Sequence, residues 1–269
     1  MSGAGSDASH PAMNEPARVL LALDAAAQDP FALEVFVELA RAFDSELAAL
    51  VVQDIDLLRL ARLPFALEYG ALTASARPLD EQRLGFGLRE RVARLERQLI
   101  ASLKQSHQRF SLSVTEGKMV PRAMAASTNG DFVLFGTPPP LLRQPPLGLS
   151  PAHRRGIVLL VEEAPPPSRA LEVAAQLQRR LNTSLSILVA GLDDEAFARL
   201  RTEITAYLSP GPRPPRFHRV ACAQPVALAR AAAAERAELL VLPRALSVSC
   251  EADLGALLSV VRCSLLWVR

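Results

Sequence analysis

The feature that most constrains the fold of this chain is an order of apolar runs that occurs on both sides of a proline-rich stretch. Before that stretch, Arg18–Leu23 and Asp131–Gly136 have the composition of buried strands, and after it Gly156–Val161 and Leu239–Leu242 have the same composition. Short apolar runs that alternate with amphipathic helical segments predict parallel strands joined by right-handed helical crossovers. The repeated order indicates two imperfect copies of one α/β unit.

Each copy is expected to be an open, twisted, mainly parallel sheet with helices on both faces. In the first copy the pattern predicts strands at 18–23, 47–52, 110–114 and 131–136, with helices at 31–43, 57–63, 88–103 and 120–127. In the second it predicts strands at 156–161, 185–190, 217–222, 239–242 and 264–268, with helices at 170–181, 197–208, 225–236 and 254–261. The first copy therefore lacks a last helix and strand. Since a bare strand edge invites aggregation, we expect the linker or the other copy to cover the edge of its fourth strand.

Segments rich in glycine, serine or proline indicate where the domains begin and end. A Gly-, Ser- and Ala-rich segment at 1–16 is interpreted as a flexible tail, and residues 17–137 as the first domain with an insertion at 54–85. The proline-rich stretch at 138–153 cannot form a regular helix or a central strand, so it is the expected linker. Residues 154–269 form the second domain.

Charge and composition narrow the classes of partner. The formal net charge is only +2 and arginine alternates with glutamate along helical faces, which is typical of a solvated surface and does not favour a nucleic-acid partner. Lys104 and Lys118 are the only lysines, and neither follows the glycine-rich turn that a phosphate-binding P-loop requires. No apolar run is long enough to cross a membrane, so no membrane partner is expected.

The cysteines and the N-terminal segment bear on the compartment. Cys222, Cys250 and Cys263 are odd in number and widely spaced, which fits neither a disulfide framework nor a zinc site. Cys222 and Cys263 are expected to be buried in strands, and Cys250 to be exposed in a loop. Because the first residues carry no apolar core of a signal peptide, we expect a cytoplasmic, reducing location.

The sequence contains no motif typical of a catalytic site or of a metal site. The sequence contains no G-x-S-x-G elbow, and its histidines are scattered over a tail, a helix end, the linker and a strand: His10, His107, His153 and His218. The densest acidic group, Asp193–Glu195, opens a predicted helix, where carboxylates meet the positive end of the helix dipole. We therefore expect no enzyme, no catalytic residue and no metal site.

The order of elements resembles the universal stress protein family, in a tandem form with two domains. Val19–Asp24 is similar to the family's opening strand, Asp131–Gly136 and Glu238–Leu242 to its fourth strand, and Cys263–Val268 to its closing strand. The resemblance implies an adenine nucleotide alpha hydrolase-like fold with strand order 3-2-1-4-5 in each unit. It also implies a homodimer, although a tandem repeat can satisfy such an interface within one chain.

The resemblance locates a nucleotide site, but its loop is degenerate here. Nucleotide-binding members carry a loop of the form G-x-x-G, nine residues, then G-S or G-T after the fourth strand, since glycines let main-chain amides approach phosphates. Here Gly136 is followed by prolines at 138–140, which have no amide hydrogen, and Pro243 stands at the matching place in the second copy. Asp24, Val52 and Gly136 remain as candidate cofactor-binding residues of the first domain. Each also has a structural explanation that needs no ligand. Asp24 can cap the following loop or helix, Val52 can be an ordinary strand residue, and Gly136 can allow a tight turn at the end of its strand.

The leading hypothesis is a stress-response or regulatory protein that binds a protein partner and has lost ATP binding in the family's manner, with no cofactor. Its candidate recognition surfaces are the leucine- and aromatic-rich segment Ile55–Tyr69 and the proline-rich linker; the alternative for those leucines is that they cover the sheet. A rival hypothesis is a sensor that binds ATP or AMP through Asp24 and Gly136. A small-molecule or lipid carrier that uses the apolar insertion is a third.

Overall fold

The computed structural model describes residues 18–25, 29–69, 75–103, 110–128, 130–136, 156–162, 168–209, 213–244 and 250–269. The first half contains β1 (Arg18–Asp24), α1 (Pro30–Phe43), β2 (Glu46–Asp54), α2 (Ile55–Ala61), β3 (Leu67–Tyr69), β4 (Ala76–Pro78), α3 (Glu81–Leu103), β5 (Phe110–Gly117), α4 (Met119–Ala126) and β6 (Phe132–Phe135). The second half contains β7 (Gly156–Val161), α5 (Ser168–Leu181), β8 (Ser184–Ala190), α6 (Asp194–Leu208), β9 (Arg216–Val220), α7 (Pro225–Ala234), β10 (Ala237–Pro243), α8 (Glu251–Val260) and β11 (Ser264–Val268). The predicted tail and linker lie outside the described residues.

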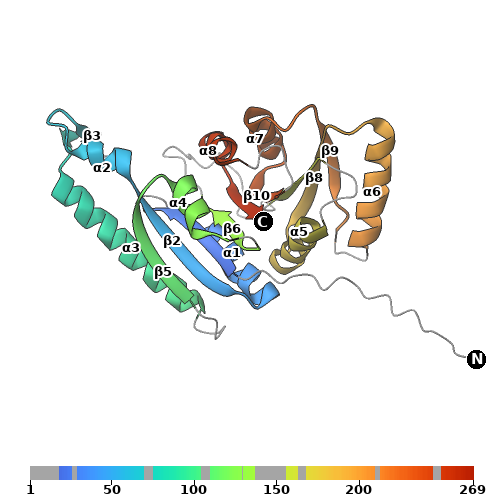
Figure 1. The fold of residues 1–269 in the computed structure, drawn as a ribbon, viewed down its shortest axis with the longest axis horizontal. Helices are drawn as coiled ribbons and strands as arrows, with labels where there is room; N and C mark the ends of the chain where they lie inside the picture. The colour runs from blue at the N-terminus through green and yellow to red at the C-terminus, as the bar shows by residue number, and fades with distance from the viewer. Residues whose placement is uncertain are drawn as a thin grey trace, which may run out of the picture.

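The two halves share one nine-stranded sheet, in the order β5-β2-β1-β6-β11-β10-β7-β8-β9 (Figure 1). Within each half every strand pair of this sheet is parallel. The second half has the predicted order 3-2-1-4-5, and the first half has the same order up to its fourth strand. The predicted α/β class and strand order are therefore confirmed.

The halves meet through an antiparallel pair that the sequence pattern did not predict. Strand β11 of the second half pairs with β6 of the first, so that Leu265 lies opposite Phe135 and Val268 opposite Phe132. The two sheets expected from the sequence are thus continuous. The fourth-strand edge of the first copy is covered by the other copy, which was one of the two predicted covers.

The central strands are buried on both faces because helices cover both sides of the sheet. Every residue of β6, β7 and β11 is buried, as expected for apolar parallel strands. On one face the core contains side chains of α1, α3, α5 and α6, and on the other it contains side chains of α4, α7 and α8. Where the halves join, α1 packs against α5 and α4 packs against α8.

Buried Asp131 and two partly exposed arginines, Arg18 and Arg169, form hydrogen bonds where the two halves meet, which we call the joint. Asp131 is fully buried, and its Oδ2 accepts hydrogen bonds from Arg18 at 3.1 Å and from the Thr128 amide at 2.7 Å. Arg169 of α5 donates to the Gly130 carbonyl at 2.8 Å and to the Arg269 carbonyl at 3.1 Å, and its guanidinium lies over the Phe132 ring. Burial lowers the pKa of Arg169. Arg169 of the second half thereby binds the first half just before β6 begins.

Side-chain caps begin the helices where the sequence indicated. Asp193 Oδ1 accepts from the Ala196 amide at 2.7 Å at the start of α6, which confirms capping as its role. Asp29 Oδ1 accepts from the Ala32 amide at 3.0 Å, and Pro30 begins α1 with the fixed φ that a first helical position tolerates.

The segment between β2 and α3 forms a projection at one end of the molecule. It contains α2 and the small antiparallel pair β3·β4, and in Figure 1 it lies at the end farthest from the second half. The ion pair of Arg62 with Glu81 at 2.9 Å links it to the start of α3. The predicted helix is present, whereas the β3·β4 pair was not expected.

The cysteines differ in exposure. Cys263 is buried and Cys250 is exposed, as expected, and all three are free thiols. Cys222 was predicted to be buried in a strand, but β9 ends at Val220 and Cys222 lies beyond it, partly exposed. The predicted strand therefore ends two residues beyond the end of β9.

Candidate functional site

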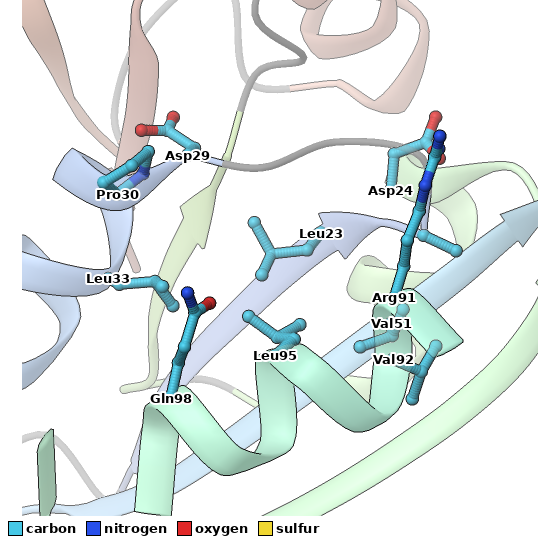
Figure 2. Close-up of a pocket in the computed structure, with 11 residues that line it drawn as sticks. Leu23, Asp24, Asp29, Pro30, Leu33, Val51, Arg91, Val92, Leu95 and Gln98 are labelled. Atoms are coloured by element: carbon cyan, nitrogen blue, oxygen red, sulfur yellow. The ribbon is translucent and has the colours of Figure 1, made fainter. Parts of the chain in front are cut away.

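A small cavity lies where β1 and β2 end, between α1 and α3. Leu23, Asp24 and Val51 line it from the strands, Asp29 and Leu33 from the start of α1, and Arg91, Val92, Leu95 and Gln98 from α3 (Figure 2). The carboxyl ends of parallel strands are where ligands bind in open α/β sheets. This is the edge at which the sequence placed a nucleotide site.

The three candidate cofactor-binding residues do meet at this edge. Asp24 lies directly opposite Val52 in the parallel pair β1·β2, and the Gly136 amide donates to the Ala22 carbonyl at 3.0 Å. Of these three residues, only Asp24 lines the cavity. Val52 is buried and its side chain packs with the core on the α4 side of the sheet, while its carbonyl accepts from the Ala25 amide at 2.9 Å.

Close packing accounts for the glycine at 136. A Cβ atom there would lie 2.3 Å from Leu23 Cδ2 and 3.6 Å from the Cβ atoms of Ala32 and Asp29. Leu23 is itself buried, so its side chain would have to shift within the core to admit a methyl group at 136. The structural interpretation, a close strand exit, therefore explains Gly136 without a ligand. The prolines at 138–140 lie outside the described residues.

Asp29 also lines the cavity, at the start of α1. Its Oδ1 caps α1, and its Oδ2 accepts a hydrogen bond from the Ser264 hydroxyl at 2.6 Å. The carboxylate thus lies between the cavity and the first residue of β11. An Asp-Pro pair at a helix start signals the cap, but nothing local to it signals the bond to β11.

Arg91 is the cationic residue of the cavity that the sequence analysis missed. In the sequence it belongs to a run of arginine and glutamate that was interpreted as a solvated face of α3. In Figure 2 its side chain extends from α3 toward Asp24 at the cavity mouth. A cation beside an aspartate at this edge is suited to orient a polar ligand or to hold the loop ends together.

The volume of the cavity limits what it holds. At about 60 Å³ it has room for a few water molecules. Sites for drug-sized ligands are larger by a wide margin, at roughly 300–1,000 Å³. The cavity in the described residues is therefore too small for a nucleotide without movement of its walls.

Several other charged and polar side chains form ion pairs or hydrogen bonds with one another. Lys118 Nζ lies 3.2 Å from Asp54 Oδ1 and also hydrogen-bonds Asp56, and these bonds raise the pKa of Lys118. Glu235 lies between Ser186, whose hydroxyl donates to it at 2.7 Å, and His218, whose Nε2 is 3.0 Å away. A nucleophilic triad has histidine in the middle position, so this order does not suit one.

In the second half, Pro243 ends β10 at the place that corresponds to Gly136. Proline supplies no amide to a phosphate. The acidic segment after β7 is described only to Glu162, and the loop 245–249 is outside the described residues. Within the described parts of the chain, no cluster of three or more His, Cys, Asp and Glu side chains is placed to hold a metal ion. No helix there is long and apolar enough to cross a membrane.

The most exposed apolar side chains lie on the projection. Phe65 is 73% exposed and Tyr69 is 71% exposed. Leu60, Leu63 and Leu67 are exposed as well, so five large apolar side chains occur within ten consecutive residues. We call these five residues the apolar projection. Leu58, by contrast, packs against the core beneath α3, so only part of the predicted surface covers the sheet.

Comparison with known proteins identifies the fold. No family model matches the sequence, and no curated protein sequence is similar to it. A universal stress protein from Archaeoglobus fulgidus DSM 4304 is similar in structure, with 12% sequence identity, 93% of this chain and 96% of that chain covered, and a TM-score of 0.51. For a putative universal stress protein from Pseudomonas aeruginosa UCBPP-PA14 the identity is 12%, 94% of each chain is covered and the TM-score is 0.46. The chain has the universal stress protein fold over nearly its whole length.

Proposed function

We propose that this chain is a stress-response or regulatory protein that acts by binding a protein partner, on a universal stress protein fold that no longer binds ATP in the manner of that fold. The observation that carries the proposal is the apolar projection. Five large apolar side chains are exposed within ten residues, and such clusters of exposed apolar residues mark recognition sites on monomeric proteins. Aromatic residues such as Phe65 and Tyr69 are the side chains that dominate protein interfaces.

The site at the carboxyl edge supports the loss of nucleotide binding. Its cavity is about 60 Å³, the Val52 carbonyl is bonded to the Ala25 amide, and packing against Leu23 accounts for Gly136. The Gly136 amide is already hydrogen-bonded to the Ala22 carbonyl, so it is not available to a phosphate. We therefore assign the chain no cofactor and no enzymatic activity, and we place its action in a reducing compartment that suits its three free cysteines.

The test of partner binding is affinity capture with matched variants. The triple variant Phe65→Ser, Leu67→Ser, Tyr69→Ser removes the aromatic and aliphatic groups of the apolar projection. The control Ile100→Ser, Val114→Ser, Tyr207→Ser changes three other large apolar side chains that are exposed outside the projection. A specific partner should be retained by the control and weakened at least about tenfold by the first variant, since one or two buried anchors supply such energies. Equal loss with both variants, or no loss with either, would contradict the proposal.

The rival function is a sensor of adenine nucleotides in the first half. The observation that favours it is the pair of Asp24 and Arg91 at the cavity mouth, which places a carboxylate and a guanidinium where a nucleotide would enter. Calorimetry with ATP, ADP, AMP and cyclic AMP distinguishes the two functions. Submillimolar binding that Asp24→Ala abolishes would establish the rival, and the absence of binding supports the partner-binding function.

The pairing of β6 with β11 also affects whether two copies of the chain can form a dimer. The edge of β6, where a second copy would otherwise add a strand, is already paired with β11. We therefore expect no homodimer through this edge, and light scattering of the purified chain at several concentrations tests it. A dimer that dissociates in the apolar projection variant would show self-association as the projection's role instead.

A further inference from the structure

A second cavity, unrelated to the nucleotide edge, lies between α7 and the end of α8. It measures about 240 Å³ and is open to solvent along one side. The helices α7 and α8 lie next to each other in Figure 1 and pack together. We call this cavity the α7–α8 groove.

The floor and walls of the groove are apolar. Ala229, Ala232 and Ala233 of α7 line one side, and Val260 follows on the other. Val226 and Val260 remain 53% and 40% exposed at its rim, so the small alanine side chains leave apolar surface open to water. Burying that surface would be favourable for an apolar ligand.

Two arginines give the groove its charge. Arg230 of α7 and Arg262, just after α8, both line it and both are exposed. Within the described residues neither guanidinium forms an ion pair or a hydrogen bond, and no acidic residue lines the groove. The other polar group is the Cys263 thiol, which is buried. The groove thus combines an apolar trough with two arginines that have no ion-pair partner in the part of the chain that the structure describes.

We propose that the α7–α8 groove binds a small amphiphilic anion, specifically a free aliphatic carboxylate of medium chain length. The alanine and valine walls contact the hydrocarbon chain, and Arg230 and Arg262 bind the carboxylate, for which guanidinium is a bidentate partner. The volume falls below the roughly 300–1,000 Å³ of drug-sized sites, which suits a single short chain. This site is independent of the partner-binding function proposed above.

The test is calorimetric titration of the full chain with octanoate. Octanoate should bind with a submillimolar Kd, and shortening the chain should weaken binding about fourfold per methylene removed. Octanol, which lacks the charge, should bind at least about tenfold more weakly, the usual loss for a charge-assisted hydrogen bond. Octyltrimethylammonium should not bind.

Matched variants assign binding to the groove. Ala233→Leu fills it from an exposed helical position and should abolish binding, while Ala234→Leu, on the same helix but outside the groove, should not. The double variant Arg230→Gln, Arg262→Gln should reduce the affinity for octanoate to that for octanol, while Arg201→Gln on α6 should leave it unchanged. Circular dichroism establishes that each variant is folded.

Three results would overturn the proposal. The first is no heat of binding for octanoate in the millimolar range with the folded wild-type chain. The second is equal affinity for octanoate and octanol, which would show an apolar patch without anion recognition. The third is binding that Ala233→Leu leaves intact, which would place the ligand elsewhere.

Discussion

The hydroxyl of Ser264 donates a hydrogen bond of 2.6 Å to the carboxylate of Asp29, across 235 residues of sequence. Ser264 is the first residue of β11, and Asp29 is the N-cap of α1. One carboxylate therefore begins a helix of the first half and holds a strand of the second. Because Ser264 is buried, its hydroxyl has no access to water if Asp29 is removed.

Removal of Asp29 should destabilise the chain more than removal of Ser264. Asp29→Ala loses a cap and leaves the Ser264 hydroxyl unpaired, so the free energy of unfolding should fall by about 2–4 kcal/mol. Ser264→Ala should lower it by about 1–2 kcal/mol. In urea denaturation the double variant should lose less than the sum of the single losses, with a coupling of about 1 kcal/mol. Strict additivity would show that the two residues do not interact.

Two glycines should respond in opposite directions to alanine. Gly136→Ala places a methyl group against Leu23 and should lower the free energy of unfolding by about 1–3 kcal/mol. Gly87 lies within α3 with no atom close to where its Cβ would be, so Gly87→Ala should raise stability by about 0.5–1 kcal/mol. Thermal unfolding of the two variants side by side measures the contrast, and destabilisation by both would refute the packing account of Gly136.

The buried carboxylate at the joint should contribute more to stability than an exposed one in an ion pair. Asp131 is buried and accepts hydrogen bonds from Arg18 and the Thr128 amide, so Asp131→Ala should cost about 2–4 kcal/mol because it removes both bonds and leaves a void at a buried position. Asp194 pairs with Arg219 but its side chain is 93% exposed, and Asp194→Ala should change stability by less than about 1 kcal/mol. Guanidinium chloride denaturation of both variants at one salt concentration tests the difference.

Alkaline pH should reveal the buried thiol of Cys263. Burial, reinforced by the charge of Asp29, raises the pKa of Cys263 from 9.0 to about 12. Below pH 9 the thiol is protonated in both states, whereas between pH 9 and 12 the unfolded chain loses the proton that the folded chain keeps. Stability should therefore fall through this window, with a slope that approaches about 1.4 kcal/mol per pH unit from this group.

The control for this prediction is Cys263→Ala, whose stability should decline less steeply over the same pH range. Maleimide labelling of the folded chain at pH 8 should modify the exposed Cys250 and leave Cys263 intact. Identical pH slopes in the wild type and Cys263→Ala would rule out the linkage.

The elements and their order could be predicted from the sequence because each carries its own periodicity. The buried strand at Ser264–Val268 was predicted with the bounds that the structure shows, since an apolar run between polar ends is unambiguous. The β3·β4 pair was missed because each strand has only three residues, most of them exposed, which is too short for a strand periodicity to be recognised.

The pairing of β6 with β11 and the position of Arg91 in the cavity could not be predicted, because both depend on contacts between segments that are distant in the sequence. Apolar runs such as Phe132–Phe135 show that a strand exists but not which strand lies beside it, and the partner of β6 is roughly 130 residues away and antiparallel. Arg91 has the sequence surroundings of a solvated residue. Only the packing of α3 against β2 turns it toward Asp24.

The antiparallel pair β6·β11 also has a consequence for how the chain is made. During translation at ~5–20 residues per second, β6 emerges roughly 7–26 s before the strand that completes its hydrogen bonds. For that interval an apolar edge of the nascent first half lacks its native neighbour and is open to chaperones or to misassociation. The sheet of the first half is thus completed only after β11 of the second half has been synthesised.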